Sequence, residues 1–490
     1  MKSAIVIGSG FAGLSAATHL ADHNFKVTLL EKNDSPGGRA RIFKEKGFTF
    51  DMGPSWYWMP DVFERYFNKF GKSASDYYKL IRLDPSYKVI YGKDDDLSIP
   101  ANYEMYRNMF EAIEAGSSKN LDKFLKQASY KYEQGINKLV HKPSRSITEY
   151  INLKLLFDVI RMDIFMSYEQ HIKKFFRHEK ILRLMEFPIL FLGAVAKNTP
   201  ALYSLMNYAD IKLGTWYPMG GMNKIIEAMV QLAKDKGVVF KTGQEVMKLE
   251  VDNNKIDSVV TSKGIFKADV IVAGADYHHV DSVLLDTQYR NYNEDYWSKK
   301  VMAPSAVIYY LGVNKKVKNL LHHNLFFDAD FSSHVEEIYS NPGWPDKPLF
   351  YACVPSVTDS TVAPDGMENL FILIPVASGI EESDEIIERY YQQVINRIEA
   401  YTGDKIKDHI IYKRSFTRKD FITNYNSYKG NAYGLANTLW QTAILKPSIK
   451  NKKVKNLYYT GQLTVPGPGV PPSLISGEVV AKEVIKDIGN

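Results

Sequence analysis

The first 41 residues constrain the possible folds of this chain more than any other stretch. A short apolar run at 4–7 leads directly into Gly-Ser-Gly-Phe-Ala-Gly at 8–13, and apolar residues at helical spacing follow at 14–20. A second apolar run at 26–30 ends in Glu31. A buried strand, a glycine-rich turn, a helix, a second strand and an acid in this order predict a parallel βαβ unit that binds a dinucleotide.

The three glycines of the turn have separate roles. Gly8 lets the chain turn tightly off the strand, and Gly10 lets a pyrophosphate approach the backbone because it has no Cβ. Gly13 lets the helix pack close to the sheet, and the helix N-terminus presents N–H groups to the phosphates. The Glu31 carboxylate is expected to accept hydrogen bonds from ribose hydroxyls and to repel a 2′-phosphate, which disfavours NADP. The alternative is an ordinary strand-to-helix turn with three coincidental glycines.

A second glycine pair follows the acid, in the sequence Asp-Ser-Pro-Gly-Gly-Arg-Ala-Arg at 34–41. A backbone loop with the Arg39 cation beside it suits a phosphate group, and NAD dehydrogenases have no need of such a loop. The segment resembles the Gly-Gly-Arg motif of the large FAD-binding amine oxidase and phytoene desaturase superfamily. This resemblance implies FAD as the cofactor, whereas the alternative is a glycine-rich surface turn with a solvated arginine.

The segment at 47–60 makes the resemblance more specific. Gly-Phe-Thr-Phe-Asp-Met-Gly-Pro-Ser, followed by Met-Pro at 59–60, resembles the bacterial-type phytoene desaturases, the carotenoid desaturase branch. In that superfamily this loop lies near the flavin. The aromatic residues Trp56, Tyr57 and Trp58 either line an apolar substrate channel or belong to the core, and the sequence leaves both possibilities open.

Two later segments resemble the parts of the desaturases that return to the FAD domain. Tyr-Pro-Met-Gly-Gly-Met at 217–222 opens a helix with apolar residues at i, i+3, i+4 and i+7. In the superfamily the backbone at the position of Val246 contacts the adenine. A strand at 268–273 ends in Gly-Ala-Asp, which the resemblance places near the same site.

The C-terminal part supports the same cofactor. A strand at 456–460 ends in Gly461, and Pro-Gly-Pro-Gly-Val-Pro-Pro-Ser-Leu at 466–474 precedes a predicted helix from Ile475 to Ile488. This segment resembles the closing motif of the family, whose N–H groups can stabilise negative charge on the reduced flavin. Gln462 and Val465 replace the usual small residue and histidine, so the contacts with the isoalloxazine are less well defined by the motif.

The glycine pattern and the resemblance together imply one set of FAD-binding residues: Gly8, Gly10, Phe11, Ala12, Gly13, Glu31, Lys32, Gly38, Arg39, Ala40, Gly53, Pro54, Ser55, Trp56, Val246, Ala275, Asp276, Gly461, Gln462, Gly469, Val470, Pro471 and Leu474. The sequence singles out no acid–base pair, so no catalytic residue is predicted. The adjacent pairs His278-His279 and His322-His323 suggest a metal, but adjacent residues do not converge on a strand or helix. No metal site is expected.

Composition limits the possible partners. The net charge is +6 over 490 residues and no basic-aromatic module appears, so nucleic acid is not expected. Aromatic residues make up 13% of the chain, which suits long apolar cavities or a large core. The one cysteine, Cys353, excludes a disulfide within the chain and fits a reducing cytoplasm. A lipophilic carotenoid is the expected substrate, and the sequence does not define the oligomeric state.

A membrane surface is a second expected partner. Helices are predicted at 120–132, 147–166 and 171–183, and the last of these alternates basic and apolar residues, as interfacial helices do. The apolar run at 187–196 has ten residues, too few for a span of roughly 20. No signal peptide is recognised. The expected location is the cytoplasmic face of the membrane, and the alternative is a helical cap domain with a solvated face.

These observations predict an α/β fold with a discontinuous Rossmann-type FAD-binding domain, an α+β substrate domain and a helical, membrane-facing subdomain. The expected ranges are 1–75, 212–290 and 450–490 for the first, 76–117 and 291–449 for the second, and 118–211 for the third.

The resemblance implies an FAD-dependent carotenoid desaturase that passes hydride to flavin N5, with phytoene as the expected substrate. Alternatives within the family are a hydroxycarotenoid 3,4-desaturase and a carotenoid isomerase or saturase. An amine or protoporphyrinogen oxidase is the alternative of another class. Rab GDP-dissociation inhibitors share the fold without flavin chemistry, but the intact glycines, Glu31 and Arg39 argue against that assignment.

Overall fold

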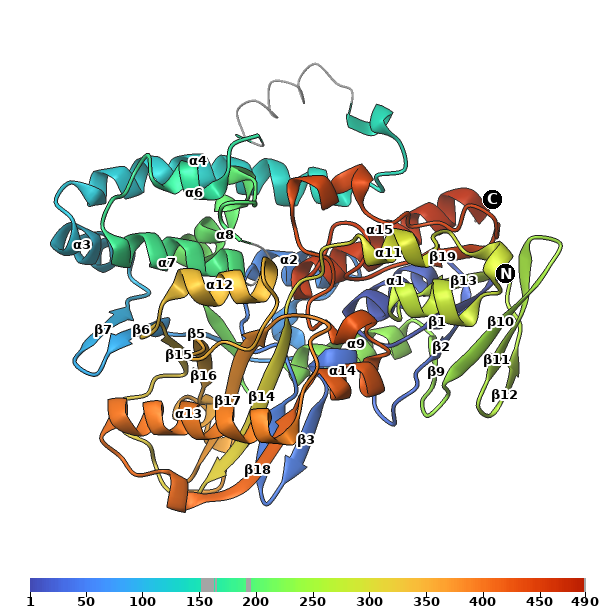
Figure 1. Ribbon diagram of the computed structural model, residues 1–490. Helices are drawn as coiled ribbons and strands as arrows, with labels where there is room; N and C mark the ends of the chain where they lie inside the picture. The colour runs from blue at the N-terminus through green and yellow to red at the C-terminus, as the bar shows by residue number, and fades with distance from the viewer. Residues whose placement is uncertain (151–162, 164, 191–194, 489–490) are drawn as a thin grey trace.

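A five-stranded parallel sheet lies at the centre of the nucleotide-binding half of the molecule (Figure 1). The computed structural model describes residues 1–150, 163, 165–190 and 195–488. In spatial order the strands are β19 (Leu457–Tyr459), β13 (Val270–Ala273), β1 (Ser3–Ile7), β2 (Lys26–Leu30) and β9 (Val239–Lys241). Strands from the beginning, middle and end of the chain therefore form one sheet, which confirms the predicted α/β class.

Three helices cover this sheet: α1 (Phe11–Asp22), α9 (Asn223–Asp235) and α15 (Val470–Ile488). Helices α1 and α15 approach so closely that a Cβ at Gly477 would lie 2.3 Å from the Ala12 carbonyl oxygen. Helix α15 begins at Val470, five residues before the predicted Ile475. Two prolines occupy its first turn, where a missing N–H costs no hydrogen bond. Because the glycine- and proline-rich sequence before Ile475 is typical of a loop, the sequence did not indicate this earlier start.

Small sheets extend the nucleotide-binding half. An antiparallel three-stranded ribbon projects at the right of Figure 1. Its strands are β10 (Val246–Asp252), β11 (Lys255–Thr261) and β12 (Gly264–Phe266). The remaining two-stranded sheets pair β3 (Ile42–Glu45) with β4 (Phe48–Asp51), and β5 (Leu80–Arg82) with β8 (Trp216–Pro218).

A seven-stranded mixed sheet forms the second half of the molecule. Its order is β18 (Ile410–Phe416), β14 (Ser305–Val313), β17 (Glu368–Val376), β16 (Phe350–Cys353), β15 (His323–Phe326), β6 (Tyr87–Gly92) and β7 (Asp95–Ile99). On β14, Val307 and Tyr309 pack with helix α13 (Asp384–Thr402), whereas Ala306 and Ile308 face the opposite core. Because successive side chains of a strand point to opposite faces, one face of this sheet packs on α13 and the other is available to the site described below.

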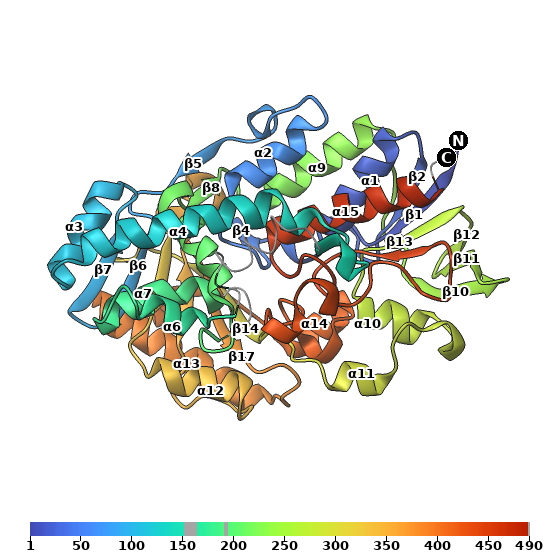
Figure 2. The ribbon, with the colours of Figure 1, turned by 90° about the horizontal axis from the view of Figure 1, so that it is seen from above.

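Helices cover the top of the molecule in Figure 1, and Figure 2 shows α4 running along the whole group. They are α3 (Tyr103–Ile113), α4 (Ser117–Asn137), α6 (Tyr168–Ile172), α7 (Glu179–Leu190) and α8 (Leu205–Tyr208). The predicted helix at 147–166 falls mostly outside the described residues. In the described part of the chain, no helix has the length and apolar character needed to cross a bilayer.

The single basic helix predicted at 171–183 is wrong. Helix α6 ends at Ile172 and α7 begins at Glu179, because the Glu114 carboxylate accepts the backbone N–H groups of Arg177 and His178, at 2.9 and 2.7 Å. The apolar side chains of this stretch pack in the core, and several of its cations pair with acids, as Lys180 does with Asp95. The stretch therefore lacks the exposed apolar face of an interfacial helix.

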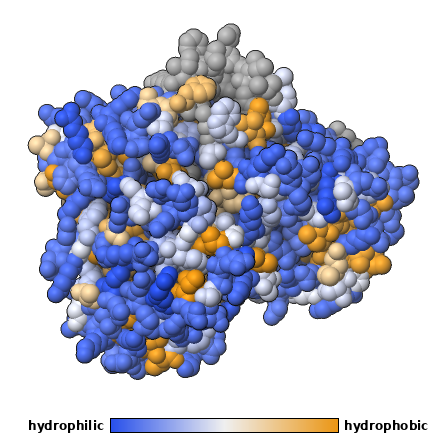
Figure 3. All heavy atoms as spheres, viewed as in Figure 1, coloured by the Kyte–Doolittle hydropathy of each residue, from blue (hydrophilic) through white to orange (hydrophobic). Residues whose placement is uncertain are grey.

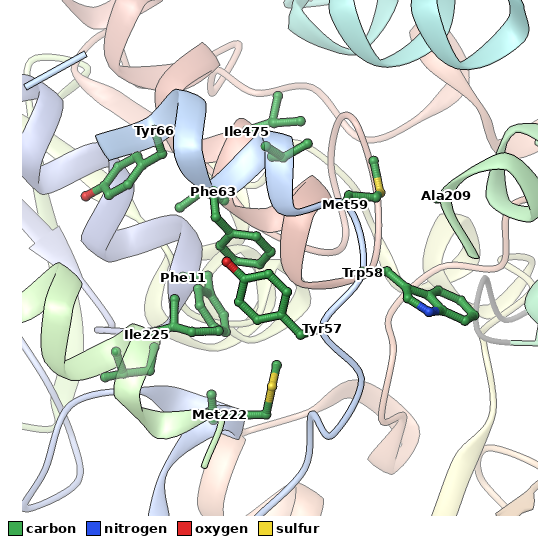
Figure 4. Close-up of a cluster of buried hydrophobic side chains, with 14 of the residues drawn as sticks. Phe11, Tyr57, Trp58, Met59, Phe63, Tyr66, Ala209, Met222, Ile225 and Ile475 are labelled. Carbon is green, nitrogen blue, oxygen red and sulfur yellow. The ribbon is translucent and has the colours of Figure 1, made fainter. Parts of the chain in front are cut away.

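An aromatic cluster packs between helices of the nucleotide-binding half and the segment at 57–66 (Figure 4). Tyr57 packs on Phe63 of helix α2 (Pro60–Asn68), with ring centroids 4.4 Å apart, and both are buried. Phe11 of α1 and Ile225 of α9 lie beside this pair, between it and these two helices. Trp58 points away from these side chains, toward Ala209, which directly follows helix α8.

One buried carboxyl group near this junction makes stability depend on pH. Asp210 accepts hydrogen bonds from the Tyr87 hydroxyl at 2.7 Å and the Thr215 hydroxyl at 3.4 Å, and burial raises its pKa to about 7. Between the ordinary carboxyl pKa and about 7, the unfolded chain has lost this proton and the folded protein keeps it. The free energy of unfolding therefore falls as pH rises through this window, by up to ~4 kcal/mol.

The Asp210→Asn variant, which keeps the acceptor for Tyr87, is expected to lose this dependence. The melting temperature of D210N relative to wild type should therefore rise between about pH 5 and about pH 8. Differential scanning fluorimetry measures the difference, and a difference that is the same at both pH values would contradict the assignment.

Candidate flavin and substrate site

The glycine turn between β1 and α1 is tightly fixed by backbone contacts. Gly8 has a φ of +91°, and its N–H donates to the Leu30 carbonyl at 2.7 Å. A Cβ at Gly13 would lie 1.9 Å from the Gly8 carbonyl oxygen, so only glycine fits there. Among the described residues other than its chain neighbours, none has an atom within 4 Å of the position that a Cβ at Gly10 would take. The turn is thus closed toward the helix and open at Gly10, as phosphate binding requires.

Glu31 is held rigidly at the end of β2. Its carboxylate accepts the Ser9 N–H at 2.9 Å, and the Asn33 backbone and side-chain N–H groups at 2.8 Å each. The Ser9 hydroxyl also donates to it. These protein donors already use both oxygens, so the ribose contact of Glu31 stays a prediction.

Arg39 is a buried cation with few partners. Its Nη2 lies 3.3 Å from the Ser427 hydroxyl and 3.3 Å from the Asn431 carbonyl oxygen, and its Nε has no hydrogen-bond partner among the described residues. Burial lowers the pKa of the guanidinium, and the nearby Tyr425 and Asp276 partly oppose this effect. The Tyr425 ring lies 5.0 Å from the guanidinium carbon. A bound phosphate would supply a directly hydrogen-bonded anion for this cation.

One cavity of about 600 Å³ connects the glycine turn with the seven-stranded sheet and the helical part. All the predicted FAD-binding residues except Gly13 and Leu474 line this cavity. Gly13 lies behind the turn, where its role is helix packing, and Leu474 is buried in the core. The unpaired Nε of Arg39 and the open space at Gly10 fit a pyrophosphate-containing cofactor.

The C-terminal loop forms the wall opposite the glycine turn. The Gly461 N–H donates to the Ser476 hydroxyl at 3.0 Å, and Gly467 and Gly469 have positive φ values of 136° and 109°. These glycines turn the chain into α15, whose first residues Val470 and Pro471 line the cavity. The N-terminus of α15 therefore places its positive dipole end beside this space, although Pro471 and Pro472 contribute no N–H groups there.

The aromatic segment after Ser55 divides between cavity and core. Trp56 and Trp58 line the cavity, whereas Tyr57 is buried outside it and shares a hydrogen bond with Tyr78. The Trp58 Nε1 donates to Thr215 at 2.8 Å. Tyr57 therefore belongs to the core, whereas Trp56 and Trp58 line a cavity, and its use as a substrate channel stays a prediction.

The part of the cavity beyond Trp56 is mainly apolar. Its wall combines side chains of β14 and β17 with side chains of the helical part, namely Ala306, Ile308, Leu373, Ile136, Leu139, Leu202, Leu205 and Met206. Sequence reasoning missed these residues, as well as Asn424, Tyr425 and Asn426 of helix α14 (Arg418–Tyr425) and its C-cap. The order of the strands and the packing of the helices bring these residues to the cavity, and no local sequence motif identifies them.

The two histidine pairs differ in their surroundings. His278 lies 3.3 Å from Glu294, and His279 faces Asn426. His322 and His323 are buried with Cys353, and one ligand atom of each lies within 4.8 Å of the others. The argument that adjacent histidines cannot converge is therefore wrong for the second pair. The absence of a metal stays a prediction.

Comparison with known proteins assigns the family. The family model "Flavin containing amine oxidoreductase" matches residues 11–485. The chain is 40% identical over 486 residues to the carotenoid 3,4-desaturase of Haloarcula japonica, covering 99% of this chain and 98% of the relative. It is 33% identical over 497 residues to the 4,4′-diapophytoene desaturase (4,4′-diaponeurosporene-forming) of Staphylococcus aureus strain Newman, with the same coverage.

Solved structures share the fold at low sequence identity. An oxidoreductase from Methanosarcina mazei has a TM-score of 0.64 at 15% identity, over 98% of this chain and all of that one. Putrescine oxidase bound to putrescine has a TM-score of 0.62 at 13% identity, over 99% of both chains. The full-length matches show that the chain is an FAD-dependent oxidoreductase of the flavin-containing amine oxidoreductase family and belongs to its carotenoid desaturase branch.

Proposed function

We propose that the cavity holds FAD along the wall formed by the predicted residues. Gly10 and Arg39 would hold the pyrophosphate, and Val246 with Asp276 the adenosine part. Gly53–Trp56 and the loop at 461–471 would hold the flavin ring. The support is the open space at Gly10, the unpaired Nε of Arg39 and the lining of one continuous cavity by these segments.

We propose that the enzyme introduces a 3,4 double bond into an acyclic, already conjugated carotenoid. The observation that carries this proposal is 40% identity over nearly the whole chain to a carotenoid 3,4-desaturase. A phytoene-type desaturation is the second candidate, supported by 33% identity to a 4,4′-diapophytoene desaturase. When bound, FAD supplies the hydride acceptor. The protein's part is to orient a flexible polyene end in a water-poor channel.

The chemistry of the wall supports a lipophilic substrate over an amine. Beyond Trp56, aliphatic side chains of β14, β17 and the helical part line the cavity. The carboxylates among the described wall residues, Glu31, Glu245 and Asp276, lie beside the predicted nucleotide-binding residues. An ammonium substrate would lose its hydration in the apolar part without gaining a counter-charge there.

A substrate panel tests the proposal. FAD-loaded protein is incubated with liposomes that contain phytoene, lycopene or a hydroxylated lycopene, and extracted pigments are analysed by chromatography and mass spectrometry. Loss of two hydrogens at the 3,4 bond of a coloured substrate supports the proposal. Desaturation of phytoene would select the second candidate. A product of unchanged mass would instead indicate an isomerase, and peroxide release with amines alone would contradict carotenoid oxidation.

We propose that the protein binds a membrane surface peripherally, beside the outer end of the cavity. Figure 3 shows a mostly hydrophilic face with apolar side chains in small separate groups, so a local patch would make the contact. Trp440 is 79% exposed, and Ile444 and Leu445 are also exposed. Thr442 and Ala443, which lie between these residues in the sequence, line the cavity. An insoluble polyene entering there would pass from lipid to apolar wall without crossing water.

The Trp440→Glu variant is expected to bind phosphatidylcholine–phosphatidylglycerol vesicles about tenfold more weakly, because a charge replaces an interfacial aromatic side chain. Ile265→Glu is the matched control, since Ile265 is 65% exposed on β12 and outside the cavity wall. Vesicle co-sedimentation measures both variants. Equal binding of W440E and wild type would contradict this location of the membrane contact.

A further inference from the structure

A phenol and an imidazole form a close pair in the wall of the substrate part of the cavity. Tyr351 lies on β16 and His323 on the adjacent antiparallel strand β15. Leu325 is opposite Tyr351 and His323 is opposite Cys353, so the two side chains are diagonal neighbours on one face of the sheet. The Tyr351 hydroxyl oxygen lies 2.6 Å from His323 Nδ1.

The surrounding residues fix this pair in place. The His323 ring stacks on Trp56, with centroids 4.0 Å apart and an interplanar angle of 9°. The Ser55 hydroxyl lies 3.0 Å from the Tyr351 hydroxyl. Ser55, Trp56 and Tyr351 line the cavity, whereas His323 is fully buried behind them. The phenol therefore faces the substrate space, and the imidazole lies behind the phenol.

The environment keeps both groups neutral at rest. Burial lowers the pKa of His323 well below its usual value, with a further decrease from the neighbouring His322, and burial raises the pKa of Tyr351. His323 Nε2 has no hydrogen-bond partner among the described residues. With the ring proton on Nε2, the Nδ1 lone pair can accept the proton of the Tyr351 hydroxyl, which can alternatively donate to the Ser55 hydroxyl.

Desaturation requires a destination for a proton. The reaction removes a hydride from one carbon and a proton from its neighbour, and FAD when bound accepts the hydride. Aliphatic side chains such as Ile308 and Leu373 of this wall have no lone pair to take the proton. A hydroxyl backed by a neutral imidazole does, and a carbon left electron-poor by hydride loss is acidic enough to give its proton to such a weak base.

We propose that Tyr351 accepts the proton released by the substrate and that His323 accepts the proton released by Tyr351. The C–H bonding pair of the substrate becomes the second bond of the new C=C. An O–H bond forms at the Tyr351 oxygen as its own proton moves to His323 Nδ1, so Tyr351 is neutral before and after and His323 becomes imidazolium. His323 returns this proton to water through Tyr351 after product release. This inference rests on the proposed carotenoid desaturation.

Three variants of the FAD-loaded enzyme test the pair in anaerobic single-turnover reactions. Tyr351→Phe removes the acceptor oxygen, and His323→Gln keeps a hydrogen-bond acceptor that cannot take a proton. Tyr412→Phe is the matched control, because Tyr412 lies on β18 outside the cavity wall. The double bond is expected to form ~10²–10⁴-fold more slowly in Y351F and H323Q, and within about threefold of wild type in Y412F.

A solvent isotope effect distinguishes proton transfer from a merely structural role. The hydroxyl proton of Tyr351 exchanges with D2O, whereas the carbon-bound hydrogens of the substrate do not. Wild type is expected to react more slowly in D2O, and this effect should vanish in Y351F, with FAD affinity and melting temperature unchanged. If wild type desaturates the carotenoid, a Y351F variant that is equally active, or that shows the same isotope effect as wild type, would overturn this inference. The proposed function would still stand. A wild type inactive on every carotenoid would overturn the proposed function, and the inference with it.

Discussion

Purified Gly13→Ala protein is expected to contain no FAD. A Cβ at this position would lie 1.9 Å from the Gly8 carbonyl oxygen and 3.0 Å from the Gly8 carbonyl carbon. Both are backbone atoms of the turn, so α1 must move away from β1 to make room. That movement displaces the N–H groups that face the cavity and disturbs the contact between α1 and α15. We expect loss of the flavin absorbance and a lower melting temperature.

The Gly10→Ala variant separates cofactor binding from folding. Gly10 has a φ of −70°, and no protein atom lies within 4 Å of the position that the added methyl group would take, so alanine fits the protein without strain. The apoprotein should therefore melt at the wild-type temperature. A pyrophosphate over this residue would collide with the methyl group, and FAD affinity should fall about tenfold or more. Wild-type FAD affinity in G10A would contradict the placement of the pyrophosphate.

Arg39→Met should weaken FAD binding about 10- to 100-fold without destabilising the apoprotein. Charge-assisted hydrogen bonds to a phosphate contribute about 1.5–3 kcal/mol each, and methionine retains only the apolar stem. In the protein itself, the guanidinium is buried and has two weak contacts at 3.3 Å, and Tyr425 and Asp276 offset its burial cost only in part, so its removal also removes the remainder of that cost.

Isothermal titration of the apoprotein with FAD, together with melting curves, measures both effects of Arg39→Met. The Arg414→Met variant is a suitable control, because Arg414 is a half-buried cation on β18 that lies over the Phe43 ring, outside the cavity wall. R39M that binds FAD like R414M would show that the guanidinium does not contact the cofactor. A large fall in the melting temperature of R39M apoprotein would show that the cation stabilises the fold itself.

The nucleotide-binding part could be predicted from sequence because its constraints are local. Gly8, Gly10 and Gly13 lie within six residues: a positive φ requires glycine at 8, a close backbone approach requires it at 13, and Gly10 leaves open space beside the turn. The strands on either side have a buried, apolar pattern that a parallel sheet imposes. The βαβ unit could therefore be predicted without knowledge of any distant contact.

Predictions failed where a tertiary contact overrides a local pattern. The alternation of basic and apolar residues at 171–183 indicated one helix, but Glu114 accepts the N–H groups of Arg177 and His178 and interrupts it. No feature of the sequence near these residues indicates that a carboxylate more than 60 positions away accepts their N–H groups.

The substrate part of the site was hidden from sequence for a similar reason. Tyr351 and His323 meet through the register of β15 and β16, and Trp56 reaches His323 from a loop more than 260 residues earlier. Their types are common in cores, and no spacing marks them as a pair. Only the packing of the loop against the sheet shows that the phenol faces the cavity.

The most direct test of the account is an anaerobic titration of the FAD-loaded enzyme with a coloured acyclic carotenoid in liposomes, followed by rapid-scan absorbance. We predict that flavin absorbance bleaches as the carotenoid bands shift to longer wavelength, with one flavin reduced for each double bond formed. Carotenoid that changes without flavin bleaching, or flavin that bleaches only with an amine or a porphyrinogen, would contradict it.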